Sequence, residues 1–282
     1  MHIQRNFILK SAALGLLLLP TAVFAQGKDC QHSDVRQLQL DLSGVKTVVF
    51  EVGQHKLRLD GASGTTGSLQ GRACASNRDW LPQLILEQKR SGDRLTVSLR
   101  RDGQSKGIFI GQNYAFLDLS GSLPANLPVQ VKVGSGDAWI TGTASLDATV
   151  GSGDLEAKRI PGAVTASVGS GDIELDQTGP LKVSSIGSGD VVARNVRGDT
   201  HVGSIGSGDF ELDGGQGNVD IGSIGSGDAD LRNITGNVTV GSIGSGDLDV
   251  RNVGGNLTVR SKGSGSVDHS GVKGTIDIPR KR

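Results

Sequence analysis

The sequence feature that most constrains the fold is a tetrapeptide, Gly-Ser-Gly-Asp, which recurs at near-constant spacing through the C-terminal half of the chain. The step from one copy to the next lengthens slightly at first and is identical from Gly187 onward. The complete copies are Gly134–Asp137, Gly151–Asp154, Gly169–Asp172, Gly187–Asp190, Gly206–Asp209, Gly225–Asp228 and Gly244–Asp247, and an eighth, Gly263–Ser266, lacks the acid. A fixed period of about 19 residues predicts a solenoid, in which each repeat buries its apolar face by stacking on the next.

Alignment of the repeats on the motif aspartate reveals an alternation of apolar and polar residues. The position after the aspartate holds Leu155, Ile173, Val191, Phe210, Ala229, Leu248 and Val267, and the position two residues later holds Ala157, Leu175, Ala193, Leu212, Leu231 and Val250. Between them lies an acidic position, with Glu156, Glu174, Glu211, Asp230, Asp249 and Asp268. A period of two predicts a strand with one buried face.

A second alternation follows a glycine in the later repeats, as in Val219–Ile221, Val238–Val240 and Leu257–Val259. Lone apolar residues between the strands and before the next motif complete the inward positions: Ile160, Val196, Ile234 and Val253, then Ile186, Ile205, Ile224 and Ile243. The 44 glycines and the absence of a 3.6-residue apolar period exclude a helical rod. We therefore predict an all-β protein, a parallel β-helix that is right-handed because parallel crossovers nearly always are.

The corners of the coils carry two further predictions. Glycine is expected there because a sharp bend favours a positive φ. Asn195, Asn233 and Asn252 align one above another, and we expect a ladder of side-chain amides at this corner. Eight coils at a strand spacing of about 4.8 Å give a rod on the order of 38 Å long.

The N-terminal residues Met1–Ala25 are typical of a secretory signal. Arg5 and Lys10 precede the apolar run Ala12–Leu19, which is short for a membrane span, and Val23–Ala25 resembles a cleavage site. We expect an exported chain with no membrane span after cleavage. Cys30 and Cys74 are its only cysteines and are predicted to form a disulfide.

Residues 26–133 are predicted to be a β-rich cap or a set of irregular first coils, and residues 134–282 the repeat solenoid. Candidate strands in the first region are Leu38–Leu42, Thr47–Val52, Lys56–Leu59, Leu84–Gln88, Arg94–Leu99 and Ala115–Leu119. Trp80 and the stretch Gly103–Asn113 are expected in loops. The last coil departs from the pattern at Gly263–Ser266, His269 and Pro279, and it ends in the basic tail Arg280–Arg282.

The repeat follows a β-rich region that ends in Leu119–Pro124 and then Val129–Val133. From about Thr47 to Ile278 the chain resembles the bacterial putative-adhesin families of β-strand repeats, domains of unknown function related to the head GIN domain group. The resemblance implies an exported β-helix and, by its label, adhesion. It carries over no catalytic residues.

Three classes of function fit such a rod. The first is a non-catalytic binding or structural protein, whose acidic column of Glu156, Glu174, Glu211, Asp230, Asp249 and Asp268 lies beside a partly basic one. The basic positions are Lys158, Arg194, Arg232 and Arg251. The two columns are either solvated charges that offset each other or an extended face for a polysaccharide or for a protein of the envelope or host surface.

The second class is calcium binding by the motif carboxylates Asp137, Asp154, Asp172, Asp190, Asp209, Asp228 and Asp247. Calcium requires six to eight oxygens, and known calcium nonapeptides have a different spacing, so we expect these residues to form turns by accepting N–H groups of their own turn. The third class is a carbohydrate-active enzyme, by analogy of fold alone. The sequence does not place an acid and a base together, as such an enzyme requires. His201 differs most from the residues at equivalent outward positions, and only Asp199 lies near it in sequence.

The sequence therefore predicts an exported, non-enzymatic β-solenoid of the periplasm or cell surface, with no cofactor. Its formal charge of zero argues against a nucleic-acid partner, because phosphate binding depends on lysine and arginine. The oligomeric state is left open.

Overall fold

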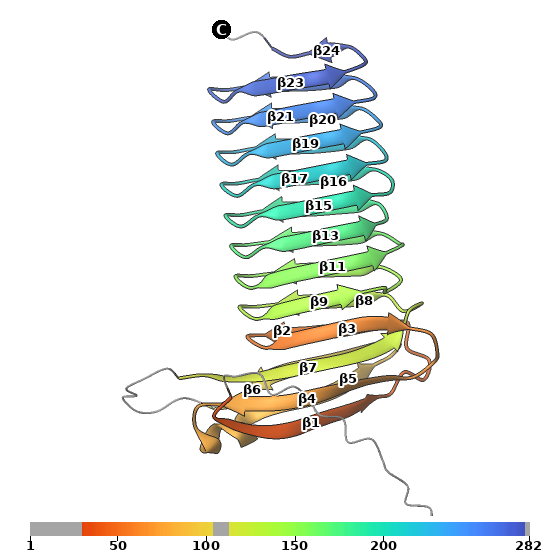
Figure 1. Ribbon diagram of the computed structural model, residues 1–282, viewed down its shortest axis with the longest axis vertical. Helices are drawn as coiled ribbons and strands as arrows, with labels where there is room; N and C mark the ends of the chain where they lie inside the picture. The colour runs from red at the N-terminus through yellow and green to blue at the C-terminus, as the bar shows by residue number, and fades with distance from the viewer. Residues whose placement is uncertain (1–29, 104–112, 280–282) are drawn as a thin grey trace, which may run out of the picture.

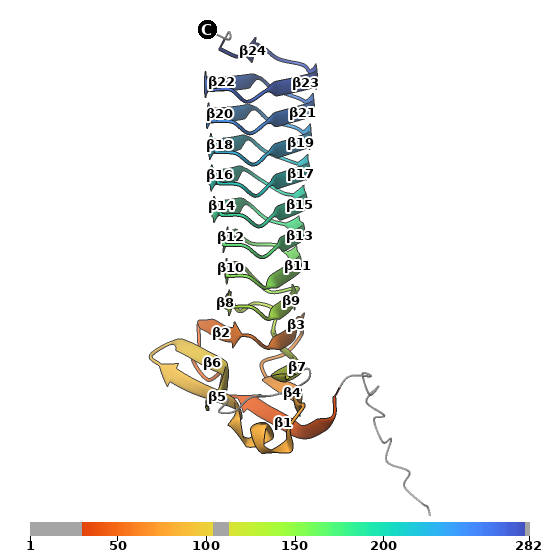
Figure 2. The same cartoon turned by 90° about the vertical axis from the view of Figure 1, so that its left-hand side faces the viewer.

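The computed structural model describes residues 30–103 and 113–279. The expected signal sequence, most of the expected loop Gly103–Asn113 and the tail Arg280–Arg282 thus lie outside the described residues. The described strands form two twelve-stranded sheets that face each other along a straight rod (Figures 1 and 2).

Sheet A contains, in spatial order, β1 (His32–Leu40), β4 (Gly67–Ala75), β7 (Ala115–Pro124), β3 (Lys56–Ala62), β9 (Asp137–Thr141), β11 (Asp154–Ile160), β13 (Ile173–Thr178), β15 (Val191–Val196), β17 (Phe210–Gly215), β19 (Ala229–Ile234), β21 (Leu248–Val253) and β23 (Val267–Val272). Sheet B contains β24 (Ile276–Asp277), β22 (Leu257–Lys262), β20 (Val238–Ile243), β18 (Val219–Ile224), β16 (Thr200–Ile205), β14 (Leu181–Ile186), β12 (Val164–Val168), β10 (Leu146–Val150), β8 (Val129–Val133), β2 (Thr47–Gly53), β6 (Arg94–Arg101) and β5 (Leu84–Ser91).

Each repeat contributes one strand to each sheet, and consecutive repeats pair in parallel. In sheet A, Phe210 pairs with Ala229 and Ala229 with Leu248, so equivalent positions of the motif stack directly. In sheet B, Val219 pairs with Val238 in the same way. The parallel β-solenoid predicted from the tetrapeptide repeat, with one motif in each coil, is confirmed.

The core of the rod is a narrow apolar layer between the two sheets. The inward positions predicted from the alternation are buried through the complete coils, and Val267 of the last coil is half-buried. Branched aliphatic side chains stack like on like along the axis, and Phe210 is the largest buried side chain within the repeats. Burial of this shared layer is what holds one coil on the next.

The motif glycines have a different role from the expected one. Their φ angles are not positive; a left-handed backbone occurs instead at a separate corner, at Arg159, Gln177, Asn195, Gly214, Asn233, Asn252 and Gly271. The second glycine of each motif is buried, and a Cβ atom at Gly189 would lie 1.8 Å from the carbonyl oxygen of Gly171. Glycine is required here because the backbones of consecutive coils touch.

The predicted amide ladder at the left-handed corner is confirmed only between its last members, where Asn252 donates to Asn233 over 3.1 Å. Asn195 and Asn233 donate instead to the carboxylates of Asp176 and Asp213. A second ladder, which the sequence analysis missed, runs through Asp199, Asn218, Asn237, Asn256 and Thr275 at another corner. Each of its side-chain oxygens accepts the backbone N–H of the next member over 2.8 to 3.0 Å.

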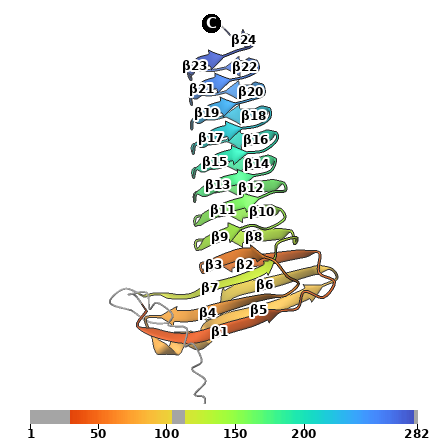
Figure 3. The same ribbon diagram turned by 45° about the vertical axis from the view of Figure 1, so that its right-hand side comes forward.

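The N-terminal end of the rod is broader than the rest, because its strands are longer (Figure 3). Strands β2 and β3 continue the two parallel sheets, whereas β4 pairs antiparallel with both β1 and β7, and β5 pairs antiparallel with β6. Strand β4 was not predicted. The expectation of a loop at Trp80 was wrong: Trp80 lies in a short 3₁₀ helix, η1 (Arg78–Gln83), and is buried against the core.

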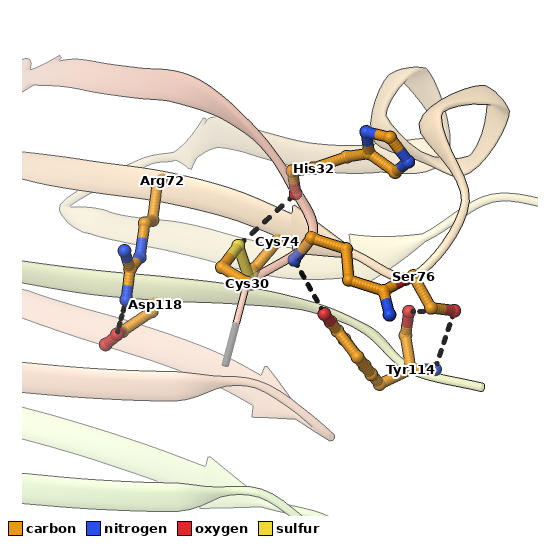
Figure 4. Close-up of a disulfide and its surroundings, with 8 residues drawn as sticks. Cys30, His32, Arg72, Cys74, Ser76, Tyr114 and Asp118 are labelled. Carbon is orange, nitrogen blue, oxygen red and sulfur yellow. Dashed lines mark hydrogen bonds and ion pairs between the residues drawn. A yellow bond between two sulfur atoms is a disulfide. The ribbon is translucent and has the colours of Figure 1, made fainter. Parts of the chain in front are cut away.

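The predicted disulfide is present. Cys30 precedes β1, Cys74 lies near the end of β4, and their Cα atoms are 5.6 Å apart (Figure 4). Nearby, the backbone N–H of Gln31 donates to the Tyr114 hydroxyl over 2.8 Å. The disulfide thus fixes the first described strand to the sheet that ends the rod.

The C-terminal end is a thin last coil. Strand β23 is largely exposed and β24 has two residues. Lys262 occupies the position of Ile243 in the preceding coil, and its ammonium donates to the carbonyl of Gly265 over 2.8 Å. Across residues 30–103 and 113–279, no helix has the length and apolar character needed to cross a membrane.

Candidate binding face of sheet A

The outward side chains of sheet A form three parallel columns along the rod. The first column is the Asp ladder, made of the motif residues Asp137, Asp154, Asp172, Asp190, Asp209, Asp228 and Asp247. The second is the acidic column predicted from sequence, Glu156, Glu174, Glu211, Asp230, Asp249 and Asp268, interrupted by Val192. The third is the mixed column, Lys158, Asp176, Arg194, Asp213, Arg232 and Arg251. Parallel register places like residues one coil apart.

The carboxylates of the Asp ladder bond from coil to coil. From Asp154 onward, each Oδ1 accepts the backbone N–H of the equivalent residue in the next coil, over 3.4 Å at Asp172 and 2.8 Å at Asp228. The ladder ends where Asp247 accepts the N–H of Ser266, a bond that lowers the pKa of Asp247. The expectation that these carboxylates bond within their own turn is corrected.

The acidic column is partly neutralised by its neighbour. Ion pairs join Lys158 to Glu156, Arg194 to Glu174 at 2.5 Å, and Arg232 to both Glu211 and Asp230; Arg251 pairs with Asp249. Burial raises the pKa of Asp230, whose Oδ1 is enclosed without a hydrogen bond. The four cations of the third column therefore offset most of the second column, although Asp176 and Asp213 add negative charge to the third.

The Asp ladder is compensated only at its start. Lys56 pairs with Asp137 at 3.1 Å, but within the described chain no ion pair forms at Asp154, Asp172, Asp190, Asp209 or Asp228. One oxygen of each of these carboxylates is held by the next coil, which leaves the other for solvent or ligand. The longest run of carboxylates without an ion pair on sheet A therefore lies on this column, while Asp176, Asp213 and Asp268 in the other two columns also lack one among the described residues.

A groove of about 500 Å³ runs between the first two columns over β9, β11, β13 and β15. Its floor is the strand backbone at Ala138, Leu155 and Ile173, whose side chains point into the core. Its walls are Asp137, Asp154, Asp172 and Asp190 on one side, and Trp139, Glu156, Glu174, Val192 and Arg194 on the other.

Trp139 was missed in the sequence analysis. It occupies the outward position of the acidic column one coil before Glu156, and the guanidinium of Arg58 lies 4.2 Å from its ring centroid. Alignment of the first motif copy with the others would have found it, since Trp139 lies two residues after Asp137 just as Glu156 lies two residues after Asp154.

The outer face of sheet B is different in character. It carries Lys182, His201, Asp220 and Thr239 in register, with small residues beside them. His201 Nδ1 lies 3.3 Å from an oxygen of Asp220, and both side chains are about half exposed. The residue near His201 in sequence, Asp199, is used in the corner ladder instead.

The residue types that bind metal ions do not form a compact cluster in the described residues. In the part of the chain that the structure describes, no three side chains of histidine, cysteine, aspartate or glutamate converge as a metal site would require.

The family comparison matches the repeats. The model of the family described as "Putative auto-transporter adhesin, head GIN domain", a domain of unknown function, matches residues 162–272. The resemblance expected from the sequence is thereby confirmed. A comparison with curated proteins gives no significant match.

Solved structures with similar chains include a putative adhesin from Parabacteroides merdae, with 15% sequence identity and a TM-score of 0.48, covering 85% of this chain and 97% of that one. A putative adhesin from Bacteroides fragilis has 14% identity and a TM-score of 0.45, covering 88% of this chain and 97% of that one.

Proposed function

We propose that this chain is an exported, non-catalytic binding protein of the cell envelope that acts like an adhesin. Its ligand is a polysaccharide or a surface protein, held along the outer face of sheet A. The family described for residues 162–272 and the disulfide between Cys30 and Cys74 both support an exported adhesin-like protein.

The observation that carries the proposal is the difference between the two faces of the rod. Sheet A repeats three charged columns over successive coils and contains the groove, whereas sheet B presents mostly small side chains over β16, β18 and β20 and has a smaller hollow of about 240 Å³ near Gln130 and Asp147. A repeated surface suits a repetitive ligand, because each added ligand unit meets the same side chains one coil further on.

The arrangement of titratable groups supports binding more than catalysis. General acid–base catalysis needs an acid and a base placed around one reacting group. The groove carboxylates instead follow the coil period and are tied into ladders or ion pairs. His201 and Asp220, the exposed pair on sheet B, lie outside the groove.

The test combines a broad glycan array with a protease-accessibility assay on intact cells. Specific glycan binding together with cleavage on intact cells supports an adhesin at the cell surface. Absence of binding, with full protection behind the outer membrane, would reject adhesion and leave a periplasmic scaffold, whose partner crosslinking would identify.

A further inference from the structure

The groove over β9, β11, β13 and β15 is distinguished from the rest of the rod by an aromatic wall. The Asp ladder alone does not mark it, since the same carboxylates continue through Asp209 and Asp228 to Asp247 with the same bonds. Only the first four coils combine the ladder with Trp139 and with the gap in the acidic column at Val192.

Trp139 is placed to contact a ligand in this groove. Arg58, on β3, covers the ring from the side toward the broad end of the rod. Apart from Asp137 and Ala138, which share β9 with Trp139, the groove residues lie on later coils, so the ring closes the groove at its start. A half-buried indole offers a large apolar surface for the C–H face of a sugar ring, or for a cation.

The carboxylates decide which groups the ligand must present. An ionised carboxylate only accepts hydrogen bonds, so the ligand must donate through hydroxyl or ammonium groups. Asp154, Asp172 and Asp190 each keep one oxygen free and lack a cation partner among the described residues. Consecutive carboxylates are one coil apart, about 4.8 Å. In water, two like unit charges repel each other by RT at ~7 Å, so neighbouring carboxylates of the ladder repel by more than RT.

A neutral sugar chain would stack on the indole of Trp139 but would leave the negative charge of the carboxylates uncompensated. An anionic sugar chain would be repelled by these carboxylates. A chain of sugar rings with unacetylated amino groups satisfies both features. Its rings stack on Trp139, and its ammonium groups repeat along the row of free carboxylates.

We propose that this groove binds a glycan that carries free amino groups. Trp139 provides the stacking surface, and Asp154, Asp172 and Asp190 bind the ammonium groups. This inference rests on the proposed function, because it names the ligand class of the same face.

Intrinsic fluorescence provides a direct readout, because the chain contains two tryptophans and Trp80 is buried in η1. A glucosamine hexamer is titrated against the full chain, with an N-acetylglucosamine hexamer and hexalysine as matched probes. We expect a saturable change of Trp139 emission with the glucosamine hexamer. Its affinity should exceed that of either comparison probe by about tenfold and should weaken with salt.

Variants separate a defined site from general attraction to the ladder. Trp139→Ala, and the pair Asp172→Asn with Asp190→Asn, should each weaken calorimetrically measured binding about tenfold. The control pair Asp228→Asn with Asp247→Asn lies on the same ladder outside the groove. It should change the binding affinity by less than about twofold. Asparagine keeps the Oδ1 acceptor of the ladder, and unchanged melting temperatures confirm folding.

Several results would overturn the inference. Equal losses in the two pairs would show diffuse attraction. Equal affinity for the acetylated hexamer would remove the role of the ammonium groups, and tighter binding of hexalysine would point to a basic peptide. If the glucosamine hexamer fails while another glycan binds on the array, this inference falls but the proposed function stands. If no glycan binds, both lose their support.

Discussion

At the scale of single residues, the second glycine of each motif is where one coil rests on the next. Its missing side chain lets the backbone approach the carbonyl of the previous coil, as Gly189 does with Gly171. The column continues through the repeats at Gly153, Gly171, Gly189, Gly208, Gly227, Gly246 and Gly265. The period of the sequence is thus set by backbone contact as well as by apolar packing.

Gly189→Ala should therefore destabilise the rod by about 3 kcal/mol or more, because its Cβ meets backbone, which cannot move aside. The measurement is chemical denaturation followed by circular dichroism. Ser188→Ala, at an exposed neighbouring position, should cost less than about 0.5 kcal/mol. A similarly small cost for Gly189→Ala would contradict the close approach of the coils.

Thr200 leaves a polar atom unpaired inside the core. Its Oγ1 is buried without a hydrogen bond, and its neighbours in the column are Leu181 and Val219. Thr200→Val should raise the free energy of unfolding by about 1 kcal/mol. The control is Thr178→Val, because the buried hydroxyl of Thr178 already donates to the Gly179 carbonyl over 3.2 Å. Equal gains in both variants would show that the unpaired hydroxyl is not the cause.

The sequence predicted which residues of the repeats face inward, because alternation determines the buried face of a strand. It did not predict the partners of the polar residues. Asp190 accepts the N–H of Asp209 rather than one from its own turn, and this choice depends on the register between coils. Register emerges only when the coils are stacked.

At the scale of elements, the junction between the broad end and the rod contains a buried histidine. His55 lies between β2 and β3 with 1% of its surface exposed. Its Nδ1 accepts the N–H of Leu117 over 3.1 Å, and its carbonyl accepts the N–H of Asp137. Burial, assisted by the charge of Arg101, lowers the pKa of His55 to about 4. The imidazole is therefore neutral in the folded protein.

This pKa makes the stability of the junction depend on pH. Between pH 6.5 and 4 the unfolded chain binds a proton at His55 and the folded chain does not, so stability falls as the pH is lowered through this range. The full loss is about 3 kcal/mol. Above pH 6.5 the effect is absent. Denaturation midpoints measured across this range provide the test.

His55→Gln keeps an acceptor for Leu117 but cannot bind the proton. Carboxylates also titrate near pH 4, so the informative quantity is the difference between the two proteins. The variant should lose less stability on acidification than the parent protein. Parallel pH profiles would show that His55 does not control the acid sensitivity of the junction.

The broad end was less predictable than the rod. Strand β4 contains Leu69 among glycine, alanine and polar residues, so it lacks the alternation that identified other strands. Trp80 is buried because Asn77 caps a short 3₁₀ helix that turns the ring toward the core, a packing that no local period signals. Repeats identify themselves by comparison with one another, whereas elements that occur once do not.

At the scale of the whole molecule, the motif carboxylates link consecutive coils along the rod through hydrogen bonds to the backbone. Each turn contributes one motif carboxylate, and from Asp154 onward its Oδ1 is used by the next coil. Calcium needs six to eight oxygens around one point. We expect the melting temperature to change by less than about 1 °C between millimolar calcium and a chelator. An increase of several degrees in calcium would make the Asp ladder a calcium site.

The groove on sheet A could be located only from the whole molecule. Trp139, the Asp ladder and Val192 are far apart in sequence, and the stacking of β9 to β15 brings them to one surface. The sequence did indicate which face carries the charge, because its acidic residues recur at the outward position of each repeat.

Binding of the ligand to the outer face of sheet A is tested by comparing two variants on the same glycan array. One variant changes sheet A at Trp139→Ala, Glu174→Gln and Asp190→Asn. The other changes sheet B at Lys182→Gln, His201→Gln and Asp220→Asn. We predict that the sheet A variant loses the glycans bound by the parent protein and that the sheet B variant keeps them. Retained binding in the folded sheet A variant, or loss in the sheet B variant, would place the ligand away from sheet A.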